Sequence, residues 1–299
     1  MPNIIYFYRI KSNILIDFLG LFSILDAMFG SKKYKDFGLA LGGGVARGIA
    51  HIGLIQCLEE YKIQPKMVTG TSMGAIIGAL WALGVSSQEM KKISKELGIL
   101  KVINFNPFTD LISRSSVQKI LDPYIGNATF DETKIPLKIV ATNLATGNAH
   151  IFSGGKIMDA IFASIALPGV FSPFSLDGEQ YVDGGVVENL PLSPIHDLPI
   201  LAASVIVPKE HNISQESFLT RGFSLLYNLY NIMLQNQESL HIKLQKNPVH
   251  LVSLESSDVG YMDFGKTEHI IQEMYQISKS IDFFLHIPKK SIFFGRTKK

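Results

Sequence analysis

Short apolar runs alternate along this chain with longer segments in which apolar residues recur every three or four positions. The short runs predict β-strands, and the longer segments predict helices with one buried face. Strands are expected at residues 37–41, 66–70, 137–143, 149–152, 180–183, 200–207 and 249–254. Helices are expected at residues 46–61, 74–83, 87–97, 115–122, 156–166, 215–246 and 267–286. The alternation predicts an α/β fold with a mostly parallel central sheet covered by helices on both faces.

One serine lies at a sharp predicted turn between a strand and a helix. Residues 70–74 read Gly-Thr-Ser-Met-Gly, with an apolar strand signal before them and a long apolar run after them. A serine at such a turn has a strained backbone that exposes its hydroxyl, and Gly70 and Gly74 leave room for strand and helix to approach. A glycine-rich turn can also be purely structural, but these flanks favour Ser72 as a nucleophile.

A second glycine-rich turn lies upstream, between the first expected strand and the first expected helix. Gly42, Gly43 and Gly44 place backbone N–H groups beside a helix N-terminus, and Arg47 follows. Such a loop binds negative charge, either a phosphate or the oxyanion of a tetrahedral intermediate. The sequence lacks the Gly-Lys-Ser/Thr of a nucleotide loop and the acidic residue of a dinucleotide fold, so the oxyanion interpretation is favoured.

A third glycine-rich segment contains an acid. Asp183 ends a short expected strand and is followed by Gly184 and Gly185. An ordinary Asp-Gly turn is the simplest interpretation of this segment. The alternative is that the carboxylate turns into a cleft, where it could act as a base.

Taken together, the three segments resemble the patatin-like phospholipase family, and residues 163–173 resemble the segment that leads to the family's Asp-Gly-Gly. The resemblance covers roughly residues 37–207. It implies a three-layer lipid acyl hydrolase with a Ser–Asp dyad, in which Ser72 matches the nucleophile and Asp183 the aspartate. The matching oxyanion loop and supporting positions are Gly42, Gly43, Gly44, Arg47, Gly70, Gly74, Gly184 and Gly185.

Three other functions stay open beside this one. A Ser-His-Asp triad would need a histidine, and His51 lies one turn past the glycine loop, although it could equally be a helix residue packed against the sheet. The later histidines have no distinctive setting; they are His196, His211, His241, His250, His269 and His286. The chain could also be a non-lipid esterase or thioesterase, or a catalytically silent module that binds lipid headgroups.

Composition narrows the class of protein. A chain of 299 residues, 46% of them hydrophobic, can bury one sizeable core, and we expect a single catalytic domain at residues 37–287. The single cysteine, Cys57, excludes an internal disulfide and a cysteine-based metal cluster, and we expect it to be packed rather than reactive. No calcium loop or zinc-ligand spacing occurs, so we expect neither a metal nor another cofactor, and a lipid rather than a nucleic acid as partner.

The two ends combine positive charge with apolar side chains. Residues 1–36 hold five basic and three acidic residues, and the tail at residues 288–299 holds five basic residues and no acid. The apolar residues of the N-terminal extension recur at helical spacing, but Asp17 and Asp26 interrupt a stretch too short to span a bilayer. The extension is therefore an interfacial helix or a helix docked on the core. With no export signal, we expect a cytoplasmic protein at the inner face of an anionic membrane.

Overall fold

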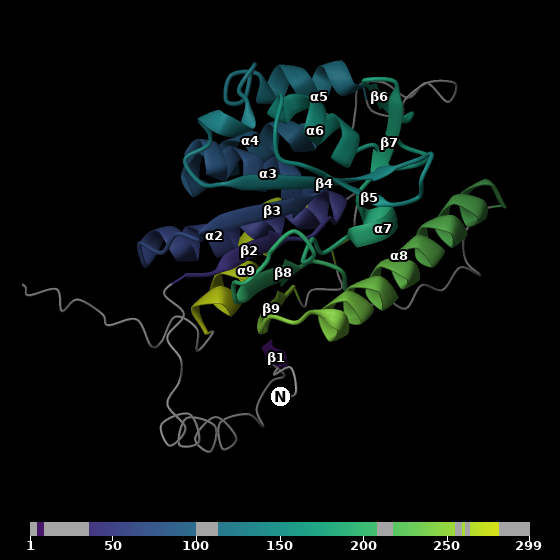
Figure 1. The fold of residues 1–299 in the computed structure, drawn as a ribbon. Coiled ribbons are helices and arrows are strands. Elements are labelled where there is room, and N and C mark those ends of the chain that lie inside the picture. Colours follow the sequence, from purple (N-terminus) through teal and green to yellow (C-terminus); the bar gives the residue numbers. More distant parts are fainter. Residues whose placement is uncertain are drawn as a thin grey trace, which may run out of the picture.

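The structure is a computed structural model, and it describes residues 5–8, 36–99, 113–207, 218–254, 259–260 and 264–280 (Figure 1). Its centre is a mostly parallel β-sheet. From one edge to the other the strands are β1 (Ile5–Tyr8), β9 (Val249–Ser253), β8 (Ile200–Ser204), β2 (Gly38–Leu41), β3 (Met67–Thr71), β4 (Leu137–Asn143), β7 (Glu179–Asp183) and β6 (Phe174–Leu176). A further strand, β5 (Ala149–Phe152), pairs with β4.

Strand direction divides the sheet into two parts. The pairs from β1 across to β4 are all parallel, whereas β5, β6 and β7 join by antiparallel pairing. The chain leaves β2 toward β3 on one side and returns to its other side as β8, which is the kind of switch point where open α/β sheets bind ligands. The expectation of a mostly parallel sheet is confirmed.

Helices cover both faces of the sheet, because its buried strands alternate their side chains between two cores. Leu39 and Leu41 of β2 point into the larger core, and Ala40 between them points into the smaller one. The larger core is built with η1 (Val45–Ala50), α2 (His51–Glu60), α3 (Met73–Leu83), α4 (Ser87–Ile99), α6 (Ile157–Ser164) and α9 (Thr267–Lys279). Cys57 of α2 is buried there, where desolvation raises its pKa to about 12, so its packing agrees with the expectation.

The smaller core lies under the segment that follows Asp183. This segment contains the short helix α7 (Gly185–Glu188) and the buried residues Leu190, Leu192 and Ile195. The long helix α8 (Phe218–Leu244) adds Ile242 to the same core and runs along the side of the molecule (Figure 1).

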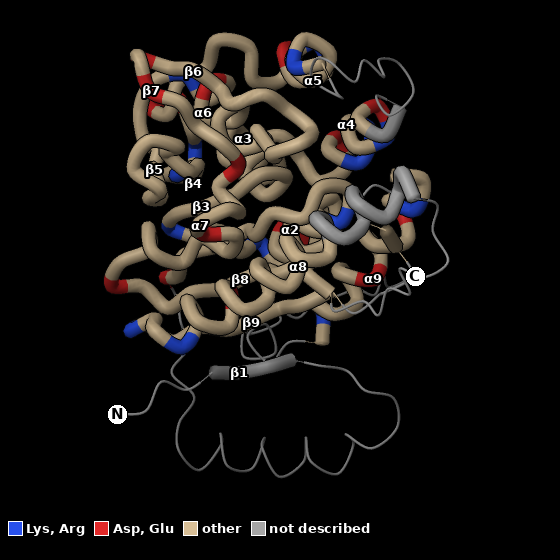
Figure 2. Tube along the Cα trace, turned by 90° about the vertical axis from the view of Figure 1, so that its right-hand side faces the viewer, with Lys and Arg blue, Asp and Glu red and all other residues tan. Residues whose placement is uncertain are grey.

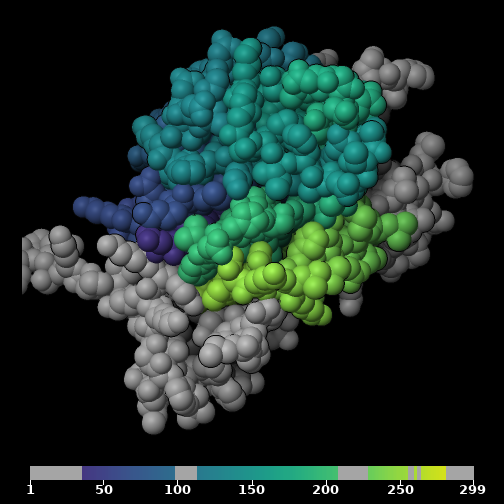
Figure 3. All heavy atoms as spheres, viewed as in Figure 1, coloured from purple at the N-terminus to yellow at the C-terminus, as the bar shows by residue number. Residues whose placement is uncertain are grey.

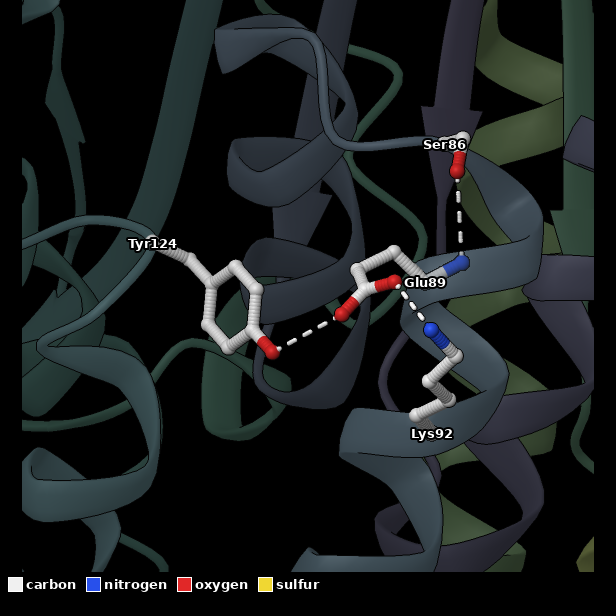
Figure 4. A network of polar contacts seen from close by, with 4 residues as sticks. All are labelled: Ser86, Glu89, Lys92 and Tyr124. Atoms are coloured by element: carbon white, nitrogen blue, oxygen red, sulfur yellow. Dashed lines mark hydrogen bonds and ion pairs between the residues drawn. The ribbon is translucent and has the colours of Figure 1, made fainter.

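A polar cluster joins α4 to the turns that follow α5 (Arg114–Leu121). The Glu89 carboxylate accepts hydrogen bonds from Lys92 at 2.8 Å and from the Tyr124 hydroxyl at 3.1 Å (Figure 4). The Glu89 N–H donates to the Ser86 hydroxyl at 3.2 Å, which caps the start of α4. These contacts connect α4 to the turn after α5. Residues 100–112, between the two helices, lie outside the described residues.

The structure adds elements that the hydrophobic pattern did not predict. β1 pairs in parallel with β9 at one edge of the sheet, and β6 pairs with β7 at the other. The first part of the helix expected at 46–61 is the 3₁₀ segment η1. The rest of the extension before Asp36, and the tail at 288–299, lie outside the described residues. Within the described residues, no helix is both long and apolar enough to cross a bilayer.

Candidate active site

Ser72 lies where β3 turns into α3, as the sequence predicts. Its backbone has φ 55° and ψ −123°, a conformation that non-glycine residues rarely adopt. The carbonyl of Ser72 accepts hydrogen bonds from the first turn of α3, including one from Ala75 at 2.9 Å. The surrounding fold thus holds a strained residue in place, which is common at catalytic turns.

The glycines on either side of Ser72 are required by close packing. A Cβ atom on Gly70 would lie 2.7 Å from the Cα of Ala75, and one on Gly74 would lie 2.7 Å from the carbonyl oxygen of Gly42. Real Cβ atoms do not approach other atoms so closely. The Gly-x-Ser-x-Gly pattern therefore brings α3 directly against the glycine loop.

A buried serine that the sequence did not single out holds the turn from below. The Ser164 hydroxyl accepts a hydrogen bond from the Ser72 N–H at 2.8 Å and donates one to the carbonyl of Val140 at 2.7 Å. Ser164 ends α6, whose other residues from Ile157 to Ala163 are mostly apolar. The sequence offered one signal for Ser164: a hydroxyl side chain at the end of a helix that is otherwise mostly apolar and so expected to be buried.

Strand register brings Asp183 to Ser72, although 111 residues separate them in sequence. Thr71 pairs with Val140 on one side of β4, and Asp183 pairs with Ala141 on the other. The Ser72 side chain lies close enough to the Asp183 carboxylate to lower its pKa, and the N–H of Gly185 donates to Asp183 Oδ1 at 2.8 Å. Only 2% of Asp183 is exposed, and this desolvation raises its pKa to about 6 despite the opposing effects of Ser72 and Gly185.

The segment after Asp183 is fixed to the sheet. The hydroxyls of Thr69 and Thr71 on β3 donate to the carbonyls of Pro191 and Glu188, at 2.6 and 3.0 Å. Gly184 packs so tightly that a Cβ there would lie 2.9 Å from a methyl group of Thr71. The Asp-Gly-Gly segment is therefore a packed part of the site and not a surface hairpin turn.

The glycine loop differs in detail from the sequence expectation. The N–H of Gly42 donates to the carbonyl of Ala203 at 3.0 Å, and the N–H of Gly43 donates to that of Asn189 at 3.1 Å. Both of these amides are therefore engaged in backbone hydrogen bonds of the fold. Among the described residues, neither Gly44 nor Val45 has an acceptor for its N–H, and both residues line a cavity with Ser72.

Val45 is strained in the same way as Ser72. Its φ of 49° is in the left-handed region, which a β-branched side chain strongly disfavours. Strain of this kind persists where the surroundings force it, and it clusters at functional sites. Here it turns the chain from the glycine loop into η1 beside Ser72.

Arg47 and His51 support the loop from beneath and do not line the cavity. The buried Arg47 guanidinium donates to the carbonyls of Val259 at 2.7 Å and Val207 at 3.5 Å. Nε2 of His51 lies 2.7 Å from the carbonyl oxygen of Gly42, and burial lowers the His51 pKa to about 4. His51 is thus a neutral donor to the loop and a buried helix residue.

A carboxylate on α8 is connected to the glycine loop through Asn189. The sequence analysis did not identify this carboxylate. Glu238 is 7% exposed, and it accepts hydrogen bonds from the Asn189 amide at 2.7 Å and the Ser204 hydroxyl at 2.6 Å. The same amide nitrogen of Asn189 is 3.3 Å from the carbonyl oxygen of Gly43. Burial raises the Glu238 pKa to about 7. The network connects α8 to the glycine loop through one side chain.

The cavity beside Ser72 is small, about 20 Å³, enough for about one water molecule. Its lining residues are Gly44, Val45, Ser72, Leu167, Asp183, Asn189, Tyr230, Asn231 and Leu234. No histidine is among them. A cavity of about 580 Å³ lies elsewhere, between the segment around Leu192 and the C-terminal end of α8, and does not include Ser72.

The described histidines that follow Asp183 do not line the cavity beside Ser72. His196 lines the larger cavity together with His241, and His269 is exposed on α9. His250 lies in β9, where burial lowers its pKa to about 4. His211 and His286 lie outside the described residues. Within the described residues, no group of three acidic, histidine or cysteine side chains could hold a metal ion.

Comparison with known proteins gives a family match over the same region. The family model described as patatin-like phospholipase matches residues 39–196, more than half of the chain. An uncharacterised NTE family protein of Mycobacterium tuberculosis is 38% identical over 162 residues, which cover 52% of this chain and 44% of that protein. The neuropathy target esterase sws of Drosophila melanogaster is 30% identical over 209 residues, 66% of this chain and 15% of that protein.

This chain therefore matches less than half the length of these curated relatives. Among solved structures, VipD from Legionella pneumophila aligns with a TM-score of 0.50 and 14% sequence identity. The alignment covers 83% of this chain and 67% of that one. At this identity the likeness supports the fold: a mostly parallel sheet flanked by helices.

Proposed function

The chain belongs to the patatin-like phospholipase family, and from that premise we propose that it is a serine hydrolase that cleaves acyl ester bonds of membrane-derived lipids. The observation that carries the proposal is the position of Ser72 beside the buried Asp183 carboxylate, since both line one small cavity and Ser72 lowers the Asp183 pKa. A serine hydroxyl becomes an effective nucleophile when a neighbouring base accepts its proton. Asp183 is the carboxylate that lines this cavity together with Ser72.

In the first half of the proposed reaction, Ser72 Oγ attacks the ester carbonyl carbon while its proton passes to Asp183. The tetrahedral intermediate then collapses: the bond to the alcohol oxygen breaks, and Asp183 returns the proton to that oxygen. The products are an acyl-enzyme on Ser72 and a free alcohol. In the second half, water attacks the acyl carbon and gives a proton to Asp183. The carboxylic acid leaves as the proton returns to Ser72 Oγ.

Burial makes a carboxylate a usable base in this reaction. An exposed aspartate has a pKa near 4 and accepts a serine proton poorly. Desolvation raises the Asp183 pKa to about 6, closer to neutral pH, which improves the match between base and operating pH. No step of the proposed reaction needs a metal or another cofactor.

The developing negative charge on the carbonyl oxygen needs donors, and we assign the N–H groups of Gly44 and Val45 to this role. Both residues line the cavity with Ser72, and in the described chain neither N–H has another acceptor. Gly42 and Gly43 hold the loop in place through their own backbone hydrogen bonds. A preorganised amide donor of this kind typically contributes about a hundred- to a thousandfold in turnover.

In its finer form, the proposal is that the chain has phospholipase A or lysophospholipase activity. We propose that it acts at the cytoplasmic face of a membrane. The basic residues at both ends of the sequence and the family membership support a lipid substrate at an anionic surface. A non-lipid esterase or thioesterase would use the same pair of side chains. A catalytically silent lipid-binding module would not need them.

Labelling with a fluorophosphonate probe tests the mechanism apart from the substrate. We expect the unsubstituted chain to be labelled and both Ser72→Ala and Asp183→Asn to lose labelling. The matched control is Asp131→Asn, which changes an exposed aspartate in the 3₁₀ turn Phe130–Glu132 and should label normally. Labelling that survives Asp183→Asn in a folded protein would overturn the dyad, and a labelled Ser72→Ala would overturn the nucleophile.

A further inference from the structure

Helix α8 has two faces of different character. Residues Asn231, Leu234, Glu238 and Ile242 recur at helical spacing and are buried against the rest of the molecule. The opposite face carries most of the exposed large apolar side chains of the described residues. Five of the seven lie on α8: Leu229, Ile232, Met233, Leu240 and Leu244, with 39–69% of each exposed. A soluble surface rarely gathers so much apolar area on one helix without a use for it.

Charge on α8 follows the same division. The one acidic residue of the helix is Glu238, and it is buried. The exposed positions from residue 229 onward hold apolar residues, Asn236 and Ser239, and then Lys243 near the helix end, with exposed Lys246 just beyond it. An apolar stripe without acids and with lysines at one end complements a bilayer with anionic headgroups.

The stripe lies on the same helix that covers the candidate active site. Tyr230, Asn231 and Leu234 line the cavity of about 20 Å³ beside Ser72, which is far too small for an acyl chain. In the described residues, the middle of α8 packs on a small apolar cluster made with Ile206. Figure 2 looks onto the side that α8 occupies, and Figure 3 shows its described turns as a light-green ridge at the surface.

We propose that the outer face of α8 is the surface by which this protein docks on a lipid bilayer that contains anionic lipid. The proposal rests on the hydrolase function proposed above, and it names the site at which that function meets its substrate. Insertion of the apolar stripe at the headgroup level would place the helix that covers the Ser72 cavity against the membrane. Movement of α8 toward the bilayer would widen the cavity for an acyl chain.

Vesicle flotation of the full chain in the Ser72→Ala background tests docking without any lipid turnover. The vesicles are phosphatidylcholine with and without phosphatidylglycerol. We expect binding to vesicles that contain phosphatidylglycerol, and at least about tenfold weaker binding after Leu240→Glu or Ile232→Glu, because a charge replaces a side chain that would enter the interface. Thermal unfolding of each variant checks that it is folded.

Leu144→Glu provides the matched control, since Leu144 is 49% exposed and Leu240 is 53% exposed, and Leu144 lies in the turn after β4. The control should float like the Ser72→Ala parent. Equal flotation of all variants would overturn the proposal, and so would absence of flotation in the parent. Gel filtration adds a further outcome: a dimer that Leu240→Glu dissociates would assign the stripe to a second copy instead.

The two proposals fail in different ways. Fluorophosphonate labelling of Ser72 reports on the reactive pair and is measured with and without vesicles. Flotation reports on the α8 surface and is measured with the reactive serine removed. A labelled chain that does not float would retain the proposed hydrolase function and overturn the docking surface, whereas a chain that floats and stays unlabelled even with vesicles present would be a lipid-binding module.

Discussion

Two side chains with unfavourable surroundings face each other at the centre of this site. Ser72 has a backbone in a disfavoured conformation, and Asp183 is a carboxylate removed from water. Neighbouring groups offset each cost: Ser164 and the first turn of α3 hold the serine, the N–H of Gly185 donates to the carboxylate, and Ser72 lowers the carboxylate's pKa. Proteins keep such costs where function needs them.

Titration of Asp183 should govern the pH dependence of turnover. The base must be ionised to accept the serine proton, and its pKa is raised to about 6 by burial. We expect kcat/KM for a soluble ester to fall about tenfold per pH unit below about pH 6 and to level off above it. Asp183→Asn should give a low rate without this inflection. An inflection that persists in Asp183→Asn would assign the titration to another group.

At the residue scale, the sequence located the two candidate reacting residues better than the residues that hold them in place. Ser72 and Asp183 were recognisable because each lies in a short glycine-rich motif, and the structure brings the two together. The use of the Gly42 and Gly43 amides within the fold was not predictable, because their acceptors, Ala203 and Asn189, are distant in sequence. Ser164 stood out only as a hydroxyl in a mostly apolar helix, because its partners, Ser72 and Val140, are distant in sequence.

At the scale of elements, hydrophobic periodicity located strands and helices that have a clear buried face. It did not locate β1 or β6, which lie at the two edges of the sheet. A strand at an edge pairs with a neighbour on one side only. Its position in the sheet therefore imposes a weaker hydrophobic pattern on its sequence. Glu238 shows what periodicity could have found: it lies between Leu234 and Ile242 at spacings of four, so a helix there would bury it.

Glu238 should make the stability of the α8 contact depend on pH. Its pKa is about 7 in the fold, against 4.5 for an ordinary glutamate, so the folded state binds the extra proton. The stabilisation is therefore full below about pH 4.5 and is lost as pH rises through about 7. A shift of this size corresponds to at most about 3 kcal/mol in the free energy of unfolding.

Glu238→Gln keeps the shape and hydrogen-bonding capacity of the side chain but removes the titration. We expect the variant to gain stability relative to the unsubstituted chain as pH rises from 5 to 8, measured by urea unfolding at each pH. Glu268→Gln, an exposed position on α9, is the matched control and should show no such trend. A parallel pH dependence in the Glu238→Gln variant and the unsubstituted chain would contradict the raised pKa.

At the scale of the whole molecule, the sheet is extended by a strand from the start of the sequence. β1 occupies the edge beside β9, and the buried residues Val249, Leu251 and Val252 belong to that neighbouring strand. Without β1, β9 would become an exposed apolar edge strand, which is prone to pair with other molecules.

Removal of residues 1–8 should therefore lower the melting temperature, by on the order of 5 °C, and increase aggregation on heating. The single substitution Phe7→Pro should have the same effect, since proline removes a backbone donor from the pairing strand and restricts its conformation. Scanning calorimetry and light scattering measure the two effects. Unchanged melting and scattering in both variants would show that the β1–β9 pairing contributes little.

The size of the cavity beside Ser72 also has a kinetic meaning. A space of about 20 Å³ admits no reagent larger than water, so any reagent must wait for a rare wider state before it reaches the serine. Its inactivation rate would then rise with reagent concentration only up to a ceiling, and that ceiling is the opening frequency of the protein itself. Reagents of very different reactivity would share it, and a bilayer that held the wider state would raise it for all of them.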